Sequence, residues 1–259
     1  MKQSHMQKSI GFKKHDLSRR NFSLSEETVW WATISNIYHR MRLAAVAGEY
    51  RVRWDGTDLI VLPNVYAPGF FTDSFWFASK LPGIVGNSTL LEIGTGTGII
   101  SISCAKTGAR VVATDINSSA VRNAQINSDR LGLNISVREG DVYKPINKAE
   151  KFDYIFWAHP FNNWSTPVDD MLLRSGMDYR YESLREYISG ARDHLTPSGK
   201  LLLGTGDSAD LKTIKLIARE NDFRLRVVVE TQMLLEEEAT SQITYMLIEF
   251  VSTKCCDVE

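Results

Sequence analysis

Apolar positions recur with a helical period near the start of the chain and then give way to short alternating runs. Residues 29–41 place apolar side chains three or four positions apart, after Ser23, which begins a capping-box pattern, and before Gly48, which would end a helix. Residues 50–62 contain two short alternating runs around Asp55-Gly56, a pair that favours a tight turn. The pattern predicts a helix followed by a β-hairpin.

From Thr89 onward, apolar strand-like runs alternate with amphipathic helical runs. The predicted strands are Thr89–Ile93, Arg110–Thr114, Ile135–Glu139, Tyr154–Trp157 and Lys200–Gly204. The predicted helices are Ile99–Lys106, Ser118–Leu131, Leu184–His194 and Ser208–Asn221. The alternation is typical of an α/β fold with a doubly wound parallel sheet. It ends with two strands, Arg224–Glu230 and Ile243–Phe250, that have no long helical pattern between them.

The chain length suits one sizeable domain with an appendage. Within 259 residues we expect an N-terminal arm, helix and hairpin over 1–65, which would cover the substrate, a main domain over 66–252, and a tail over 253–259. The net charge is −1, so nucleic acid is an unlikely partner. Up to Arg53, however, ten Lys and Arg face four acidic residues. This basic leader is either a solvated tail or a docking region for an acidic protein partner.

The three cysteines fit neither a disulfide framework nor a metal-ligand spacing, so we expect no metal. Cys104 falls in a predicted helix and is expected to be a small core residue, whereas the adjacent Cys255 and Cys256 lie in a polar tail. No apolar run reaches the length of a membrane span, and the first residues have no apolar core typical of a leader. The sequence therefore predicts a reduced, cytoplasmic protein without a membrane partner.

A glycine-rich turn follows the first strand of the alternating region. Glu92 ends the strand, and Gly94, Gly96 and Gly98 then open a helix, with Thr95 between them. The spacing is G-x-G-x-G, whereas dinucleotide-binding turns have G-x-G-x-x-G and point backbone N–H groups at a pyrophosphate. A carboxylate beside such a pyrophosphate would repel it, and it suits a cationic ligand instead. S-adenosylmethionine carries both a sulfonium and an ammonium group. The run resembles the first motif of the class I S-adenosylmethionine-dependent methyltransferases.

Acidic residues also follow the next two strands, at the edge of the sheet where ligands bind in such folds. Asp115, which precedes Ile116, lies about 20 residues past the glycines and could accept from both ribose hydroxyls, or it could cap the following helix. Asp141 could accept from the adenine amino group while Val142 packs on the ring, or Asp141 could be an ordinary turn residue. With these residues the resemblance implies a seven-stranded, Rossmann-like sheet whose last strand is inserted antiparallel at the sheet edge.

The fourth strand runs into Ala158-His159-Pro160-Phe161, which resembles the N-P-P-Y/F motif of the release-factor glutamine methyltransferases and their base-methylating relatives. The upstream run Val65–Asp73 is similar to the segment that precedes the first motif in the same families. There the resemblance places Tyr66 at the substrate pocket and Thr72 near the methionine end of the cofactor. Phe71, Pro160 and Phe161 would line an aromatic acceptor pocket.

The motif departs from the family at its first two positions. Ala158 stands where the family has an Asn whose side-chain oxygen accepts from the target N–H, so only the backbone carbonyl is kept. This makes a planar amide or an exocyclic amine a doubtful acceptor, and it favours a small-molecule or amino-acid-like acceptor methylated at N or O. His159 replaces the first proline and is either the base that deprotonates the acceptor or an imidazole packed under the proline turn.

The sequence thus predicts an S-adenosylmethionine-dependent methyltransferase with a small-molecule substrate. One alternative is a protein-glutamine or RNA-base N-methyltransferase, which the departure at Ala158 disfavours. The other is a module that binds the cofactor without transferring its methyl group.

Overall fold

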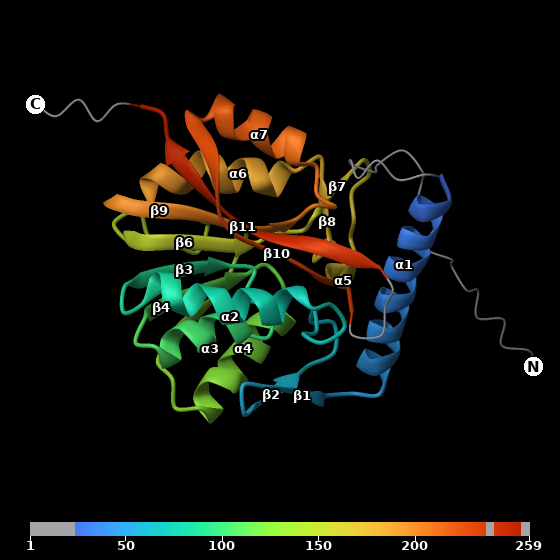
Figure 1. Cartoon of the computed structure of the whole chain (residues 1–259). Helices are drawn as coiled ribbons and strands as arrows, with labels where there is room; N and C mark the ends of the chain where they lie inside the picture. Colours follow the sequence, from blue (N-terminus) through green and yellow to red (C-terminus); the bar gives the residue numbers. More distant parts are fainter. Residues whose placement is uncertain (1–23, 237–240, 255–259) are drawn as a thin grey trace, which may run out of the picture.

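The computed structural model describes residues 24–236 and 241–254, which build a seven-stranded sheet with helices on both faces (Figure 1). In spatial order the strands are β10 (Phe223–Leu234), β11 (Gln242–Ser252), β9 (Leu195–Gly206), β6 (Phe152–Ala158), β3 (Thr89–Ile93), β4 (Arg110–Asp115) and β5 (Ile135–Glu139). β11 is antiparallel to both of its neighbours, and the pairs from β9 to β5 are parallel. The predicted sheet with an antiparallel last strand is therefore confirmed, with β10 taking the outermost place.

Two layers of helices cover the sheet because successive strand side chains point to opposite faces. Leu90 packs with one buried cluster and its neighbour Leu91 with the other. On the first face lie α2 (Asp73–Val85), α3 (Ile99–Lys106) and α4 (Ser118–Arg130), and on the second lie α6 (Glu182–Gly190) and α7 (Leu211–Glu220). The predicted core residue Cys104 is fully buried in α3, and Cys255 and Cys256 lie outside the described residues.

Four elements have no counterpart in the sequence prediction. The largest is α2, in which three consecutive aromatic residues at 75–77 and Pro82 obscure the helical spacing of the buried side chains. The others are β7 (Asn162–Trp164), α5 (Met171–Arg174) and β8 (Met177–Tyr179), which are too short for a periodic pattern. The predicted helix Leu184–His194 is α6 followed by the 3₁₀ helix η1 (Ala191–Asp193).

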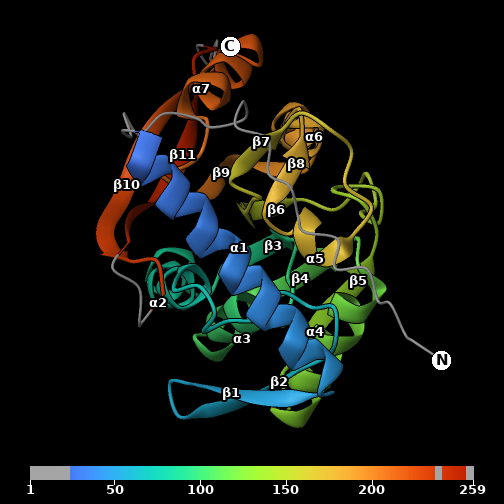
Figure 2. The same cartoon turned by 90° about the vertical axis from the view of Figure 1, so that its right-hand side faces the viewer.

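The N-terminal part forms the predicted helix and hairpin, and these two elements pack against different parts of the main domain. Figure 2 shows α1 (Leu24–Val46) crossing in front of the sheet. The hairpin of β1 (Tyr50–Trp54) and β2 (Thr57–Val61) packs instead on α4. Two asparagines of α4 take the place of a neighbouring strand, since Asn127 Oδ1 accepts from Ile60 N at 2.8 Å and Asn123 Oδ1 accepts from Leu62 N at 2.8 Å.

Residues 1–23, which contain most of the basic leader and the predicted cap Ser23, lie outside the described part of the chain. Among the helices of residues 24–236 and 241–254, none has the length and apolar character needed to cross a membrane.

Candidate active site

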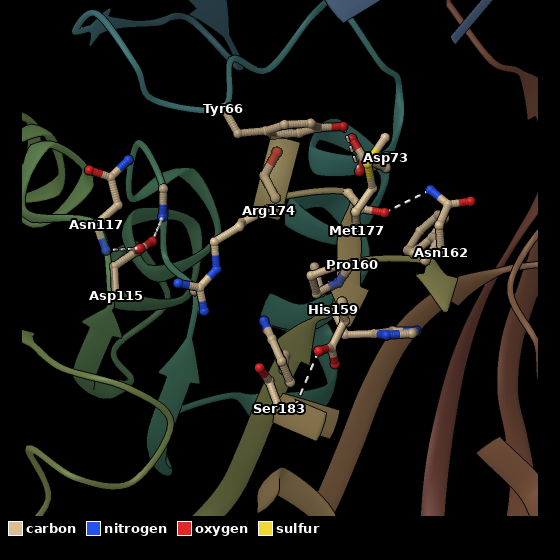
Figure 3. Close-up of a pocket in the computed structure, with 18 of the residues that line it drawn as sticks. Tyr66, Asp73, Asp115, Asn117, His159, Pro160, Asn162, Arg174, Met177 and Ser183 are labelled. Atoms are coloured by element: carbon tan, nitrogen blue, oxygen red, sulfur yellow. Dashed lines mark hydrogen bonds between the residues drawn. The ribbon is translucent and has the colours of Figure 1, made fainter. Parts of the chain in front are cut away.

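A cavity of about 440 Å³ opens where the parallel strands β3, β4 and β6 end (Figure 3). Its floor is the glycine turn after β3 together with the ends of β4 and β6. α1 contributes Trp30, Ile34 and Tyr38 to the opposite wall, whereas no described residue of the hairpin at 50–61 lines it. The cavity therefore lies where ligands bind in doubly wound folds, and α1 is the part of the appendage that covers it.

Glu92 is buried at the base of the glycine turn and holds the turn together. Its Oε2 accepts from Thr95 Oγ1 at 2.9 Å and from Ser101 N at 3.1 Å, and also from the Ser101 hydroxyl. Burial is the main cause that raises the pKa of Glu92, to about 7, and these hydrogen bonds oppose it. The carboxylate thus ties the turn to the first residues of α3 while it lines the cavity.

The glycines at 94, 96 and 98 all have positive φ, but they do different things. Gly94 and Gly96 line the cavity, and a Cβ on Gly94 would lie 2.8 Å from the indole nitrogen of Trp157. Gly98 is not among the lining residues. A Cβ there would lie 3.1 Å from Ala124 Cβ, so Gly98 lets α3 and α4 approach each other.

Asp115 ends β4 and lines the cavity beside Ile116. One carboxylate oxygen accepts from Gly96 N at 2.9 Å and the other from Asn117 N at 2.9 Å. The cap of α4 is Asn117, whose side chain accepts from Ser119 N, so the alternative in which Asp115 caps this helix is wrong. Burial raises the pKa of Asp115, and the charge of Arg174 opposes that shift.

Asp141 and Val142 lie in the turn after β5, and both line the cavity. Val142 is buried and has a φ of 44°, which is rare for a β-branched residue. The side chain of Asp141 is 29% exposed and forms an ion pair with Lys144 at 2.7 Å. Asp141 is therefore already paired at the rim, unlike Asp115.

The loop before α2 brings a hydrogen-bonded pair into the cavity. Tyr66 OH donates to Asp73 Oδ2 at 3.1 Å, and the Tyr66 ring stacks on Phe71 with centroids 5.7 Å apart. Burial raises the pKa of Asp73 to about 6, while the Tyr66 hydrogen bond lowers it. Thr72 does not line the cavity. Its hydroxyl donates to Leu234 O at 2.7 Å and lies 3.1 Å from Tyr245 OH, so it joins the loop to β10 and β11.

The four residues from 158 to 161 all line the cavity, but His159 turns its ring toward β9 (Figure 3). Its Nε2 lies 2.9 Å from Thr205 Oγ1, and its buried Nδ1 has no hydrogen-bond partner among the described residues. Desolvation lowers the pKa of His159 to about 3, so the ring is neutral at physiological pH. This environment agrees with the alternative in which the imidazole is packed under the proline turn, rather than with the alternative in which it acts as the base.

Arg174 and Asp178 belong to the cavity although the sequence analysis gave them no role. Arg174 ends α5 and points into the space between Asp115 and Pro160 (Figure 3). Asp178 accepts from the backbone N–H groups of Ser183 and Leu184 at the start of α6. Burial raises the pKa of Asp178 to about 6. Neither residue lies in a strand-end position that spacing alone would single out.

Acidic side chains dominate the cavity. Among the described residues seven carboxylates line it, against one guanidinium, that of Arg174. The seven are Asp73, Glu92, Asp115, Asp141, Asp169, Asp178 and Glu182. Such a cavity attracts a cation and repels phosphate groups.

Comparison with known proteins identifies relatives along most of the chain. The model of the methyltransferase small domain family matches residues 58–232. A protein of Methanocaldococcus jannaschii, described as a candidate protein N5-glutamine methyltransferase, is 42% identical over 191 residues, which cover 70% of this chain and 94% of the relative. The release factor glutamine methyltransferase of Geobacter sulfurreducens is 26% identical over 162 residues, covering 58% of this chain and 56% of that protein.

A solved structure with a similar fold is the 16S rRNA N2 G1207 methyltransferase of T. thermophilus in complex with AdoMet and guanosine. It superposes with a TM-score of 0.58 at 17% identity, over 79% of this chain and 50% of that one. At this identity the likeness concerns the fold alone.

These relatives overturn the expected partner. The sequence analysis favoured a small-molecule substrate because Ala158 lacks the family's side-chain amide, and it gave nucleic acid as unlikely. The two relatives found by sequence are named for protein glutamine methylation, so the small-molecule expectation is wrong, and neither of them supports the exclusion of nucleic acid. The error came from treating one missing side chain as decisive for the acceptor.

Proposed function

The chain belongs to the methyltransferase small domain family and is an S-adenosylmethionine-dependent methyltransferase, and we propose that its acceptor is the side-chain amide nitrogen of a glutamine in a protein. The relative that is 42% identical carries this choice, since it is described as a candidate protein N5-glutamine methyltransferase and this chain matches 94% of its length. A glutamine side chain is neutral, so the acidic lining of the cavity does not oppose its entry.

The cavity fits the cofactor on independent grounds. S-adenosylmethionine supplies a methyl group on a sulfonium centre when it is bound. We propose that Glu92, Thr95 and the backbone at Gly94 and Gly96 face its methionine part, and that Asp115 and Ile116 hold the ribose. Val142 would pack on the adenine and Asp141 would accept from its amino group. The acidic lining complements the sulfonium and ammonium charges of this ligand.

The acceptor would enter on the side of Pro160 and Phe161. Tyr66, Phe71 and Phe161 give this side aromatic surfaces that can hold a flat amide group. α1, which lines the same part of the cavity, would cover the entering segment. Because methyl transfer is an in-line displacement, holding the nitrogen in place and excluding water account for most of the rate.

Methylation of purified proteins tests the proposal. The chain is incubated with labelled S-adenosylmethionine and, separately, a release factor, ribosomal protein uL3 and ribosomal RNA. Mass spectrometry then locates the added methyl group. At limiting S-adenosylmethionine we expect label on a glutamine side-chain nitrogen, much less label with the Asp115→Ala variant, and full label with Asp222→Asn, which removes an exposed carboxylate paired with Lys254. Label on an RNA base, or on another protein side chain only, contradicts the proposal.

A further inference from the structure

The chain lacks the amide oxygen that its family places at position 158, and the nearby asparagines do not replace it. Asn162 lines the cavity, but its amide nitrogen donates to Gly176 O at 2.7 Å, and its amide oxygen points to the other side, away from Met177 and Pro160 (Figure 3). The amide nitrogen of Asn163 lies 3.3 Å from Asp210 Oδ2, at the start of α7. An oxygen that accepts the target N–H must therefore come from another part of the fold.

Asp73 brings a carboxylate to the same cavity from the first residue of α2. Figure 3 shows Asp73 above Met177 and on the side of the view away from Asp115. Its neighbour Thr72 is connected with the degenerate motif through Tyr245, whose hydroxyl is 3.1 Å from Thr72 Oγ1 and whose ring centroid is 6.3 Å from that of Phe161. Asp73 thus belongs to a segment that packs, through Thr72 and Tyr245, against the segment that carries the motif.

Asp115 and Asp178 use both carboxylate oxygens to accept from backbone N–H groups. Asp73 uses only one oxygen in this way. Asp73 Oδ1 accepts from Ser74 N at 2.6 Å, whereas Oδ2 accepts from the hydroxyl of Tyr66. A hydroxyl hydrogen can rotate, and a carboxylate oxygen has a second lone pair, so Oδ2 can accept another N–H without breaking the turn.

We propose that Asp73 substitutes for the missing amide oxygen, accepting the N–H of the acceptor and receiving its proton. This inference rests on the proposed function, in which the acceptor nitrogen belongs to a glutamine amide. The bond between that nitrogen and the methyl carbon forms, and the bond between the methyl carbon and sulfur breaks with its electron pair going to sulfur. The N–H proton passes to Asp73 and then to water. The products are N-methylglutamine, S-adenosylhomocysteine and one proton.

The environment of Asp73 suits a base. Burial raises the pKa of Asp73 to about 6, so its carboxylate is a stronger base than an exposed one. At neutral pH the group is still mostly ionised. The groups that oppose the upward shift are Ser74 and the hydroxyl of Tyr66, whose hydrogen bonds lower the pKa of Asp73. The charge of Asp73 in turn raises the pKa of Tyr38 on α1 and of Tyr245 on β11. Burial raises the pKa of each of these tyrosines, so they stay protonated.

The experiment must separate this role from contact with the ammonium group of the cofactor. It compares wild type, Asp73→Asn, Ala158→Asn and the double variant, with Asp222→Asn as the charge-removal control. Turnover is measured on the glutamine-containing protein that wild type methylates. Calorimetry with S-adenosylhomocysteine measures cofactor affinity, and thermal melting verifies folding.

We expect Asp73→Asn to lower kcat by about 10²-fold or more, as for a lost general base, while the Kd for S-adenosylhomocysteine changes less than about threefold. Adding Ala158→Asn should recover at least about tenfold of the loss, because a family-like oxygen then returns to the motif. A large rise in Kd in Asp73→Asn, or a folded variant that turns over normally, overturns the inference.

Failure of the proposed function gives a different result. If wild type methylates a nitrogen other than a glutamine amide, the proposed acceptor is wrong, and the same four proteins are compared on that nitrogen. A kcat loss at unchanged Kd there would retain Asp73 as the base. If wild type turns over on every acceptor tested but Asp73→Asn is unaffected, Asp73 has no part in the transfer.

Discussion

The cavity has two walls, one formed by a single stretch of chain and the other by several distant segments. The wall proposed to hold the cofactor, called the cofactor wall below, comes from one stretch of chain, from Glu92 to Asp115, in which strand, turn, helix and strand follow one another. The wall proposed to hold the acceptor, called the acceptor wall below, joins the loop at Tyr66 and Asp73, the end of β6 at Pro160, the region around Arg174 and two residues of β11. Local spacing therefore determines the first wall, whereas the second depends on which distant segments the fold brings together.

The walls also differ in how their side chains are satisfied. On the cofactor wall, Glu92 and Asp115 accept from groups within or directly after the same stretch, so the protein's own hydrogen bonds hold this wall in shape. On the acceptor wall, His159 has an unpartnered buried nitrogen among the described residues, and Asp73 Oδ2 accepts from the hydroxyl of Tyr66. A preformed cofactor wall beside a more adaptable acceptor wall is consistent with one cofactor serving many acceptors across a family.

The largest effect is expected on the cofactor wall, at Asp115. Replacing Asp115 by Ala removes the acceptor proposed for the ribose hydroxyls, and it should weaken binding of S-adenosylhomocysteine by about 1–3 kcal/mol, roughly ten- to a hundredfold in Kd. Isothermal calorimetry measures this. Asp115→Asn is the matched control, because it keeps one oxygen for Gly96 N or Asn117 N, and it should lose less affinity. Unchanged affinity in Asp115→Ala would show that the ribose lies elsewhere.

The two walls were not equally predictable from the sequence. The glycine turn and Asp115 are recognised by their spacing along the chain. This spacing was enough to predict the fold, the cofactor and the position of the end of β4 at the cavity. α2 could not be predicted, since the apolar run at 75–78 and Pro82 hide the helical spacing of Phe77, Leu81 and Val85. The resemblance assigned Thr72 to the site but no role to Asp73 beside it. The acceptor was then judged from Ala158 alone, and that judgement was wrong.

A smaller effect on function is expected at His159, on the acceptor wall. Because the ring is buried and its pKa lies near 3, we expect His159→Ala to lower the free energy of unfolding by about 2–3 kcal/mol through the cavity it leaves. His159→Phe, which keeps the volume, should be less destabilised and should keep turnover within about threefold of wild type. Thermal melting and steady-state kinetics measure both variants.

The pH–rate profile distinguishes Asp73 from His159 as the base. A carboxylate with a raised pKa is active when deprotonated, so turnover should rise with pH through about 6, the pKa of Asp73. This rise should persist in His159→Phe and disappear in Asp73→Asn. If the rise is lost in a stable His159→Phe protein and turnover falls a hundredfold, the imidazole is the base after all.

The smallest effect is expected at Asp141, where the cofactor wall reaches the rim. Its carboxylate is already paired with Lys144 and partly exposed, so solvent screens any contact that it makes with the adenine amino group. We expect Asp141→Asn to weaken S-adenosylhomocysteine by no more than about threefold, since the amide oxygen can still accept from the amino group. Lys144→Gln serves as the matched control, because it removes the ion pair and leaves the carboxylate free.

Calorimetry should also compare S-adenosylhomocysteine with its inosine analogue, in which an oxygen replaces the amino group. If Asp141 reads that amino group, wild type and Lys144→Gln will prefer the adenine form, and Asp141→Asn, whose amide nitrogen can donate to the inosine oxygen, will prefer it less. Equal preference in all three proteins would leave Asp141 a turn residue, and would confine the specific contacts of the cofactor wall to the stretch from Glu92 to Ile116.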